Sequence, residues 1–260
     1  HINDEEREYL YEKAYSVRYE HYKNSVYVRG LIEFSNYCKN DCTYCGISIH
    51  NKELTRYHMT PEEVIKTAEI GYSLGFRTFV MQGGEDTSFT DDKFAAIISS
   101  IKTQFPEAAV TLSIGERSKE SYQKLYDAGA DRFLIRHETI NKKLYEKLHP
   151  KMSYENRIKS LFDLKDIGFQ VGTGFMVGVP GQEIEDIADD LLFIKELNPH
   201  MIGIGPFIPH KNTPLRDESA GSAELTYTLI AILRLMLPTS LIPSTTSLAT
   251  LKSENRYKGF

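Results

Sequence analysis

Cysteine is scarce in this sequence of 260 residues, and long apolar runs and an excess of basic charge are missing. No apolar run approaches the roughly 20 residues of a membrane-spanning helix, and the N-terminus lacks the apolar region of a secretory signal. The net charge of −5 gives no support for binding to nucleic acid or to an anionic membrane surface. These absences favour a cytoplasmic enzyme that acts on a small molecule.

The three cysteines that are present all lie in one short segment, NYCKNDCTYCGI. Cys38, Cys42 and Cys45 have the spacing C-x3-C-x2-C, and one short loop cannot pair three of them in disulfides, which favours a reducing compartment. Thiolates this close in sequence can converge on one metal centre, and three ligands to a four-iron cluster leave one iron open to a substrate or cofactor. Zinc is the alternative, with His50 or His58 as a fourth ligand.

Strand and helix patterns alternate along the chain. Runs rich in β-branched and apolar residues predict strands at 26–34, 78–82, 109–115, 132–138, 170–179, 201–208 and 241–247. Helices are predicted at 3–24, from Thr60 to about 74, at about 91–105, 118–128, 183–197 and 222–236, with a long helical stretch after 138 that breaks at Pro150. Thr60 with Pro61 and Glu63 has the residue pattern of a helix start.

This alternation without hairpin signals predicts an α/β fold with a parallel sheet, specifically a TIM-type (β/α)8 barrel. An eighth strand would fall beyond residue 260, so we expect the C-terminal strand and helix to be missing from this chain. The sequence begins at His1, which predicts a trimmed N-terminus. We expect one domain, 1–260, in which residues 1–25 form a helical lead-in.

In such barrels the loops after the strands carry the active site. Chemically informative residues follow each predicted strand in turn: the cysteines, GGED (83–86), Ser113 with Glu116, Arg136 to Glu138, Met176 with GVPG, PFIPH, and Thr245 with Thr246. This convergence predicts a catalytic face at the carboxyl ends of the strands.

The fourth strand end has the clearest polarity pattern. Alternation places Arg136 and Glu138 on one face and His137 on the other, so we expect Arg136 in the pocket, while His137 fits a core histidine. A buried cation needs an anionic partner, which a substrate carboxylate would supply. The glycines of GGED allow close backbone approach and its carbonyl oxygens can accept from an ammonium group, although GGED equally fits a simple turn.

Four hydroxyl residues near these strand ends are candidate substrate contacts: Thr111, Ser113, Thr245 and Thr246. Each hydroxyl can hydrogen-bond an anionic ligand, and each can equally be satisfied by neighbouring backbone.

With the aromatic Tyr44 before the last cysteine, the cysteine motif resembles that of the radical S-adenosylmethionine (SAM) enzymes. The stretches RGLIEFSNYCKNDCTYCGI, RHET and GIGPFIPHKNTPL resemble more narrowly the HydE family of [FeFe]-hydrogenase maturases, in the biotin-synthase-like group. The resemblance extends over about residues 25–250.

The resemblance implies two cofactors, a [4Fe–4S] cluster on Cys38, Cys42 and Cys45, and SAM, whose amino and carboxylate groups chelate the fourth iron. It implies SAM contacts for Tyr44, Gln82, Gly83, Gly84, Glu85, Asp86, Glu138, Arg157, Met176 and Ile208. Glu138 would accept the ribose hydroxyls, Arg157 would pair with the carboxylate, and Tyr44, Met176 and Ile208 would lie near adenine. The ordinary alternatives are a cap carboxylate for Glu138, a solvated arginine for Arg157 and barrel core for Met176.

The implied reaction is reductive cleavage of SAM to a 5′-deoxyadenosyl radical. The radical would act on a small cysteine-derived iron complex during assembly of the [FeFe]-hydrogenase cluster, with transient contact to other maturases. A methylornithine synthase remains an alternative, as does a non-catalytic metal-stabilised barrel. Biotin synthase is disfavoured because it needs further cysteines, which this chain lacks.

Overall fold

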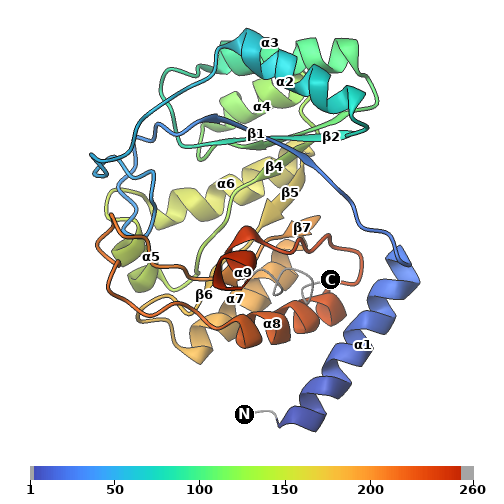
Figure 1. Cartoon of the computed structure of the whole chain (residues 1–260), viewed down its shortest axis with the longest axis vertical. Helices are drawn as coiled ribbons and strands as arrows, with labels where there is room; N and C mark the ends of the chain where they lie inside the picture. The colour runs from blue at the N-terminus through green and yellow to red at the C-terminus, as the bar shows by residue number, and fades with distance from the viewer. Residues whose placement is uncertain (1–2, 253–260) are drawn as a thin grey trace.

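The computed structural model describes residues 3–252, in which helices and parallel strands alternate (Figure 1). The strands are β1(Gly30–Ser35), β2(Thr78–Gly83), β3(Ala109–Ser113), β4(Arg132–Leu134), β5(Gln170–Thr173), β6(Met176–Val177), β7(Met201–Ile202) and β8(Gly205–Pro206). The helices are α1(Asp4–Tyr22), α2(Pro61–Ser73), α3(Asp91–Gln104), α4(Lys119–Asp127), α5(Lys142–Leu148), α6(Tyr154–Ile167), α7(Ile184–Leu197), α8(Ala223–Met236) and α9(Thr246–Leu251). None of these described helices is long and apolar enough to cross a membrane.

The helix starts follow from local capping chemistry. The Thr60 hydroxyl accepts from the backbone N–H of Glu63, and the Glu63 carboxylate accepts from the backbone N–H of Thr60, which makes the predicted start of α2 a capping box. The same reciprocal bonds join Asn3 and Glu6 at the start of α1. The predicted break at Pro150 separates α5 from α6.

Six strands form one parallel sheet in the order β1-β2-β3-β4-β5-β7, and β6 pairs with β8 in a second small parallel sheet. The predicted fifth and sixth strands are each split in two at a glycine-containing step, Gly174 and Gly203. A Cβ on Gly174 would lie 1.9 Å from the carbonyl oxygen of Gly203, so these two segments of the chain are in close backbone contact. The described sheet is a partial TIM barrel, as the sequence predicted.

The predicted seventh strand, 241–247, is wrong. Leu241 makes a single parallel bridge to Met201, and Thr245 is already the N-cap of α9. The apolar run at the start of this segment is too short for its pattern to distinguish a strand from a loop that leads into a helix.

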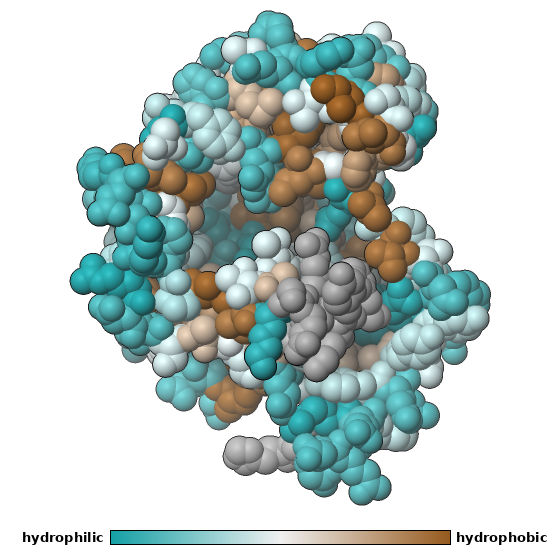
Figure 2. Space-filling view, viewed as in Figure 1, coloured by the Kyte–Doolittle hydropathy of each residue, from teal (hydrophilic) through white to brown (hydrophobic). Residues whose placement is uncertain are grey.

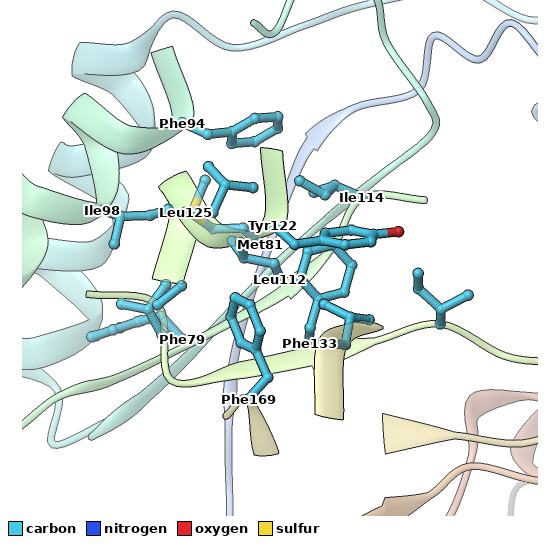
Figure 3. Packing of buried hydrophobic residues seen from close by; sticks show 14 of the residues in the cluster. Phe79, Met81, Phe94, Ile98, Leu112, Ile114, Tyr122, Leu125, Phe133 and Phe169 are labelled. Carbon is cyan, nitrogen blue, oxygen red and sulfur yellow. The ribbon is translucent and has the colours of Figure 1, made fainter. Parts of the chain in front are cut away.

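The large core fills the space between the sheet and the helices α2, α3, α4, α6 and α7. Figure 3 shows the part of it that lies between α3, α4 and the strands β2 to β4. Along β3, Val110 and Leu112 point into this core, and alternation turns Thr111 and Ser113 to the barrel interior. A small core joins β6 and β7 to α7 and α8. Helix α7 contributes Phe193 to the large core and Ile194 to the small core.

Candidate active site

The carboxyl ends of the parallel strands bring most of the predicted site residues to one side of the sheet. The cysteine loop (36–59) follows β1, Gln82 and Gly83 end β2, and Ser113 ends β3. Glu138, just beyond β4, bridges to Phe175, which directly precedes β6. The chain therefore converges here for the same topological reason that the sequence pattern predicted.

Cys38, Cys42 and Cys45 are free and half-buried in the cysteine loop. Burial, followed by the charges of the other two cysteines, raises the pKa of the Cys42 thiol, and burial also raises the pKa of Cys45. Three thiolates at this place are therefore unfavourable unless a cationic centre binds them. A thiolate-ligated iron–sulfur cluster is such a centre, so the donor set fits it.

The donor set does not fit zinc as well. Closed structural zinc sites use four protein ligands, and the three cysteines supply only three. The two histidines considered as fourth zinc ligands lie beside carboxylates instead, His50 at 4.0 Å from Asp41 and His58 at 3.7 Å from Asp86.

The GGED turn touches the cysteine loop directly. A Cβ on Gly84 would lie 2.2 Å from the carbonyl oxygen of Tyr37 and 2.6 Å from the Cβ of Cys38. On Gly83 it would lie 2.8 Å from the Phe34 ring. Glycine at both positions thus permits the close approach of the turn to β1 and the cysteine loop, while the predicted approach of a ligand amino group stays a prediction.

The two acidic side chains of GGED are already engaged by the protein. Glu85 accepts from the backbone N–H of Glu116 at 3.0 Å and lies 3.1 Å from the Lys39 ammonium. Asp86 accepts from Ser35 Oγ at 2.6 Å, and although burial opposes it, hydrogen bonds from Ser35 and Ser88 hold the pKa of Asp86 below its usual value. These carboxylates brace the turn, so a ligand amino group there would meet backbone oxygens.

Arg136 and Glu138 share a face, as predicted, with 3.1 Å between Nη2 and Oε2. The contact is not aligned as a hydrogen bond, and among the described residues Nε and Nη2 of Arg136 and Oε2 of Glu138 are buried without a hydrogen-bond partner. Glu138 also has φ +66°, a left-handed conformation that strains a non-glycine residue. Strain combined with unsatisfied buried polar atoms is typical of a ligand-binding position.

His137 lies on the opposite face, in the core, as alternation predicted. It is fully buried, its Nδ1 is 2.9 Å from Thr173 Oγ1, and its ring packs against Phe175 and Phe193.

Arg157 on α6 is buried rather than solvated, and all three of its nitrogens have protein partners. Nε lies 2.6 Å from Glu116 Oε1, and Nη1 donates to the carbonyl oxygen of Arg136 at 2.5 Å. Nη2 lies 4.0 Å from Met152 Sδ, which in turn lies 3.9 Å from Cys42 Sγ. The guanidinium therefore points toward Cys42 with Nη2, which is held only by a thioether, a weak acceptor that an anionic ligand can replace.

An aromatic group that the sequence analysis missed supports this region. The Tyr44 hydroxyl lies 3.0 Å from His149 Nε2, and His149 Nδ1 lies 3.1 Å from the carbonyl oxygen of Tyr145. Burial, then the charge of Arg157, lowers the pKa of His149 to about 3, so the imidazole is neutral. One tautomer satisfies both contacts: Nδ1–H donates to Tyr145 and Nε2 accepts from Tyr44. The available signal was the break at Pro150, which turns this segment toward the cysteines.

The predicted adenine contacts are apolar and close to the cysteine loop. Met176 packs in a cluster with Phe207 and Val179, and Tyr44 packs against that cluster. Ile208, half-buried, follows Phe207 directly.

The four hydroxyl candidates are placed differently. Thr111 is 1% exposed, and its Oγ1 has no hydrogen-bond partner within residues 3–252, while Ser113 lies two positions on along the same face. Thr245 stands at the N-cap position of α9 without a side-chain capping bond, its hydroxyl lies 3.1 Å from Ser247 Oγ, and Thr246 is exposed. Thr245 and Thr246 therefore belong to the start of α9 and not to the end of a strand.

A cavity of about 610 Å³ opens at the other end of the strands. Its lining includes Thr78, Arg132 and Gln170, the first residues of β2, β4 and β5. It therefore lies at the amino ends of the strands, the face that barrel enzymes use for stability and not for catalysis.

Comparison with known proteins defines the class of enzyme. The family model of the Radical SAM superfamily matches residues 32–194, so the chain belongs to this superfamily. Members use a [4Fe–4S] cluster and SAM, which confirms the two predicted cofactors.

The more particular likeness is to HydE. The chain is 47% identical to the [FeFe] hydrogenase maturase subunit HydE of Thermotoga maritima, over 96% of this chain and 72% of that protein, which makes it a HydE-like radical SAM enzyme. It is 32% identical to a 3-methylornithine synthase of Methanosarcina acetivorans, over 95% of this chain and 70% of that protein. The crystal structure of methylornithine synthase (PylB) superposes with a TM-score of 0.90 at 28% identity, covering all of this chain and 77% of that one. The structure of HydG, at 22% identity and a TM-score of 0.86, supports the fold alone.

Proposed function

We propose that this enzyme cleaves SAM reductively and directs the 5′-deoxyadenosyl radical to a small cysteine-derived iron complex, in the assembly of the [FeFe]-hydrogenase active-site cluster. The identity to HydE supports the pathway. The structural observation that carries the proposal is the Arg136–Glu138 pair, whose buried polar atoms lack hydrogen-bond partners among the described residues. On this proposal the enzyme works in the cytoplasm and makes transient contact with other maturases.

Cys38, Cys42 and Cys45 would each hold one iron, leaving the fourth for the amino and carboxylate groups of SAM. When bound, the reduced cluster supplies one electron to SAM, which breaks the S–C5′ bond and yields 5′-deoxyadenosyl radical and methionine. The partial burial of the three cysteines restricts the access of water, which would otherwise screen the charges of the site and react with the radical.

The chain's own groups would orient SAM. The backbone at Gly83 and Gly84 would accept from the amino group, and Nη2 of Arg157 would donate to the carboxylate. Oε2 of Glu138 would accept from a ribose hydroxyl, since it is buried and has no hydrogen-bond partner within residues 3–252. Tyr44, Met176 and Ile208 would give adenine apolar contact.

Arg136, Thr111 and Ser113 would form the substrate end of the pocket. Nε of Arg136 and Oγ1 of Thr111 are buried donors without a hydrogen-bond partner among the described residues. A carboxylate or cyanide group would accept a hydrogen bond from either donor. Thr245 and Thr246 keep a weaker claim, since Thr245 stands at the N-cap position of α9 and Thr246 is exposed.

The direct test is anaerobic reconstitution with iron and sulfide, followed by measurement of 5′-deoxyadenosine from SAM under a strong reductant. Cys42→Ser should abolish this product, because the cluster loses a ligand. Full retention of 5′-deoxyadenosine formation in Cys42→Ser would refute the cluster assignment. Hydrogenase maturation in a reconstituted mixture, with and without this enzyme, then tests the pathway.

A second candidate function is the synthesis of 3-methylornithine. It is supported by the TM-score of 0.90 to the structure of methylornithine synthase and by the 32% identity to the 3-methylornithine synthase of Methanosarcina acetivorans. Incubation with SAM and a mixture of amino acids, followed by mass spectrometry, separates the two. Formation of 3-methylornithine would favour this second function.

A further inference from the structure

His137 is a polar side chain in the core to which the proposed mechanism gives no role. Its side chain is 0% exposed, and its ring packs against Phe175 and Phe193, with centroid distances of 5.8 and 5.0 Å. Figure 2 shows the face of the molecule that is hollowed between β1 and α9, and a fully buried side chain takes no part in such a surface. His137 therefore cannot touch a ligand and can act on one only through another residue.

Two polar partners hold the His137 ring in one orientation. Nδ1 lies 2.9 Å from Oγ1 of Thr173, the last residue of β5, and Nε2 lies 3.5 Å from Oδ1 of Asp190 on α7. Thr173 Oγ1 also accepts from the backbone N–H of His137 at 3.3 Å, so this threonine binds both the side chain and the main chain. The tautomer with its proton on Nε2 fits both neighbours, because Nδ1 then accepts from the hydroxyl and Nε2–H faces a carboxylate.

Asp190 anchors the same segment at a second position. Its side chain is 0% exposed, and Oδ1 accepts from the backbone N–H of Ile140 at 2.7 Å. Among the ion pairs of the described residues, His137 is the only partner of Asp190. Because a buried carboxylate is costly unless it is paired and hydrogen-bonded, the imidazole is needed at this place. Asp190 therefore holds the segment 137–140 against α7 at both of its ends.

Glu138 lies inside this anchored segment in a strained backbone conformation. Its φ of +66° is left-handed, and a non-glycine residue keeps such a conformation only where the surrounding structure fixes it. One restraint is its own N–H, which donates to the carbonyl oxygen of Gly174 at 3.1 Å. The bonds to Thr173 and Asp190 fix the residue before Glu138 and the residue two positions after it. They therefore oppose the rotation that would return φ to negative values.

We propose that His137 is a positioning residue for SAM, which acts with Thr173 and Asp190 to hold Glu138 in its left-handed conformation. This conformation places the Glu138 carboxylate for the ribose hydroxyls, so the inference rests on the ribose contact proposed for Glu138. Without the imidazole, Glu138 relaxes and its carboxylate leaves this place, while the contacts to the amino, carboxylate and adenine groups of SAM remain. The enzyme then loses the part of its SAM affinity that comes from the ribose hydroxyls.

The test measures how strongly the reconstituted enzyme prefers SAM over 2′,3′-dideoxy-SAM, an analogue that lacks both ribose hydroxyls. Anaerobic calorimetry with the oxidised cluster gives both dissociation constants without turnover. The main variant is His137→Phe/Asp190→Asn, which keeps an aromatic ring and an acceptor for the Ile140 N–H and leaves no unpaired buried charge. Leu125→Ala on α4 is the control for a loss of stability alone, because Leu125 is a fully buried core residue.

We expect the wild type to prefer SAM by about 10- to 100-fold, as hydrogen bonds to a charged acceptor imply. His137→Phe/Asp190→Asn should bind SAM about tenfold more weakly and the analogue with wild-type affinity, so that most of the preference is lost. Leu125→Ala should keep the wild-type preference. In a Glu138→Ala background, the change at His137 and Asp190 should have no further effect on SAM affinity, because the carboxylate through which it acts is absent.

Substitutions of Thr173 give a second, milder comparison. Thr173→Val has the shape of threonine without the hydroxyl and should lose part of the preference, whereas Thr173→Ser restores the hydroxyl and should keep it. Equal weakening of SAM and analogue binding, or the same loss of preference in Leu125→Ala, would overturn the positioning role. If Glu138→Ala keeps the preference for SAM, the ribose contact is wrong and this inference with it. If Glu138→Ala loses the preference and the His137 variant keeps it, only the positioning role is wrong.

Discussion

At the scale of single residues, the sequence predicts what alternation and local chemistry determine. It placed Arg136 and Glu138 on one face by strand alternation, and the structure pairs them although β4 ends at Leu134, before both residues. It did not predict that Glu116 would bind Arg157, because these residues are 41 positions apart and no local pattern links them. The unusual backbone of Glu138, at φ +66°, is likewise invisible in the sequence.

The Arg157–Glu116 pair gives the first prediction at this scale. Arg157→Ala should weaken SAM binding and also destabilise the fold by about 3–5 kcal/mol, because it removes the cationic partner of a largely buried carboxylate, which keeps only a neutral donor, Asn156. Arg157→Ala/Glu116→Gln should recover much of the stability but not the SAM affinity. Urea unfolding and SAM calorimetry of the reconstituted variants measure the two effects. If SAM affinity returns with stability, Arg157 acts on the fold alone.

His149 gives a second prediction, for the dependence of stability on pH. Its pKa is lowered to about 3 in the folded protein and is about 6.5 in the unfolded chain, so between these values the unfolded state binds more protons. Stability is therefore fully present above pH 6.5 and is lost as the pH falls. From pH 7.5 to 5.5 the wild type should lose about 1.4 kcal/mol relative to His149→Gln. Urea unfolding of both proteins across this range checks it; parallel pH profiles would contradict the buried neutral state.

At the scale of elements, helices were predicted more accurately than strands. Helix starts depend on caps within a few residues, such as Thr60 with Glu63, and these are readable locally. Strand ends depend on neighbours far along the chain: the close backbone contact of Gly174 with Gly203 splits the fifth and sixth strands. The run 241–247 has strand-like composition, yet Thr245 stands at the N-cap position of a helix.

The contact between the GGED turn and the cysteine loop positions the backbone next to Cys38. Gly84→Ala should displace the loop, since its Cβ would lie 2.2 Å from the Tyr37 carbonyl oxygen. We expect a lower iron content per chain after reconstitution, with the helical circular dichroism signal unchanged. Gly203→Ala is the matched control, because the nearest atom to its Cβ is 4.0 Å away. Wild-type iron content in Gly84→Ala would show that the loop tolerates the shift.

At the scale of the whole molecule, the prediction of one domain depends on how the two cores are coupled. The large core covers β1 to β5, and the small core joins β6, β7, α7 and α8. Helix α7 packs into both, with Phe193 on one side and Ile194 on the other. Neither core can therefore lose its packing without exposing apolar surface of this shared helix, which predicts cooperative unfolding.

Matched truncations in the two cores test this coupling. Leu125 in the large core and Leu233 in the small core are both fully buried, so each change to Ala should cost about 2–5 kcal/mol through lost apolar contact and a residual cavity. Because α7 ties the cores together, Leu125→Ala and Leu233→Ala should each shift the entire calorimetric transition without dividing it. A transition that splits in Leu233→Ala, with one part at the wild-type temperature, would mean that β6 to α8 unfolds separately from β1 to β5.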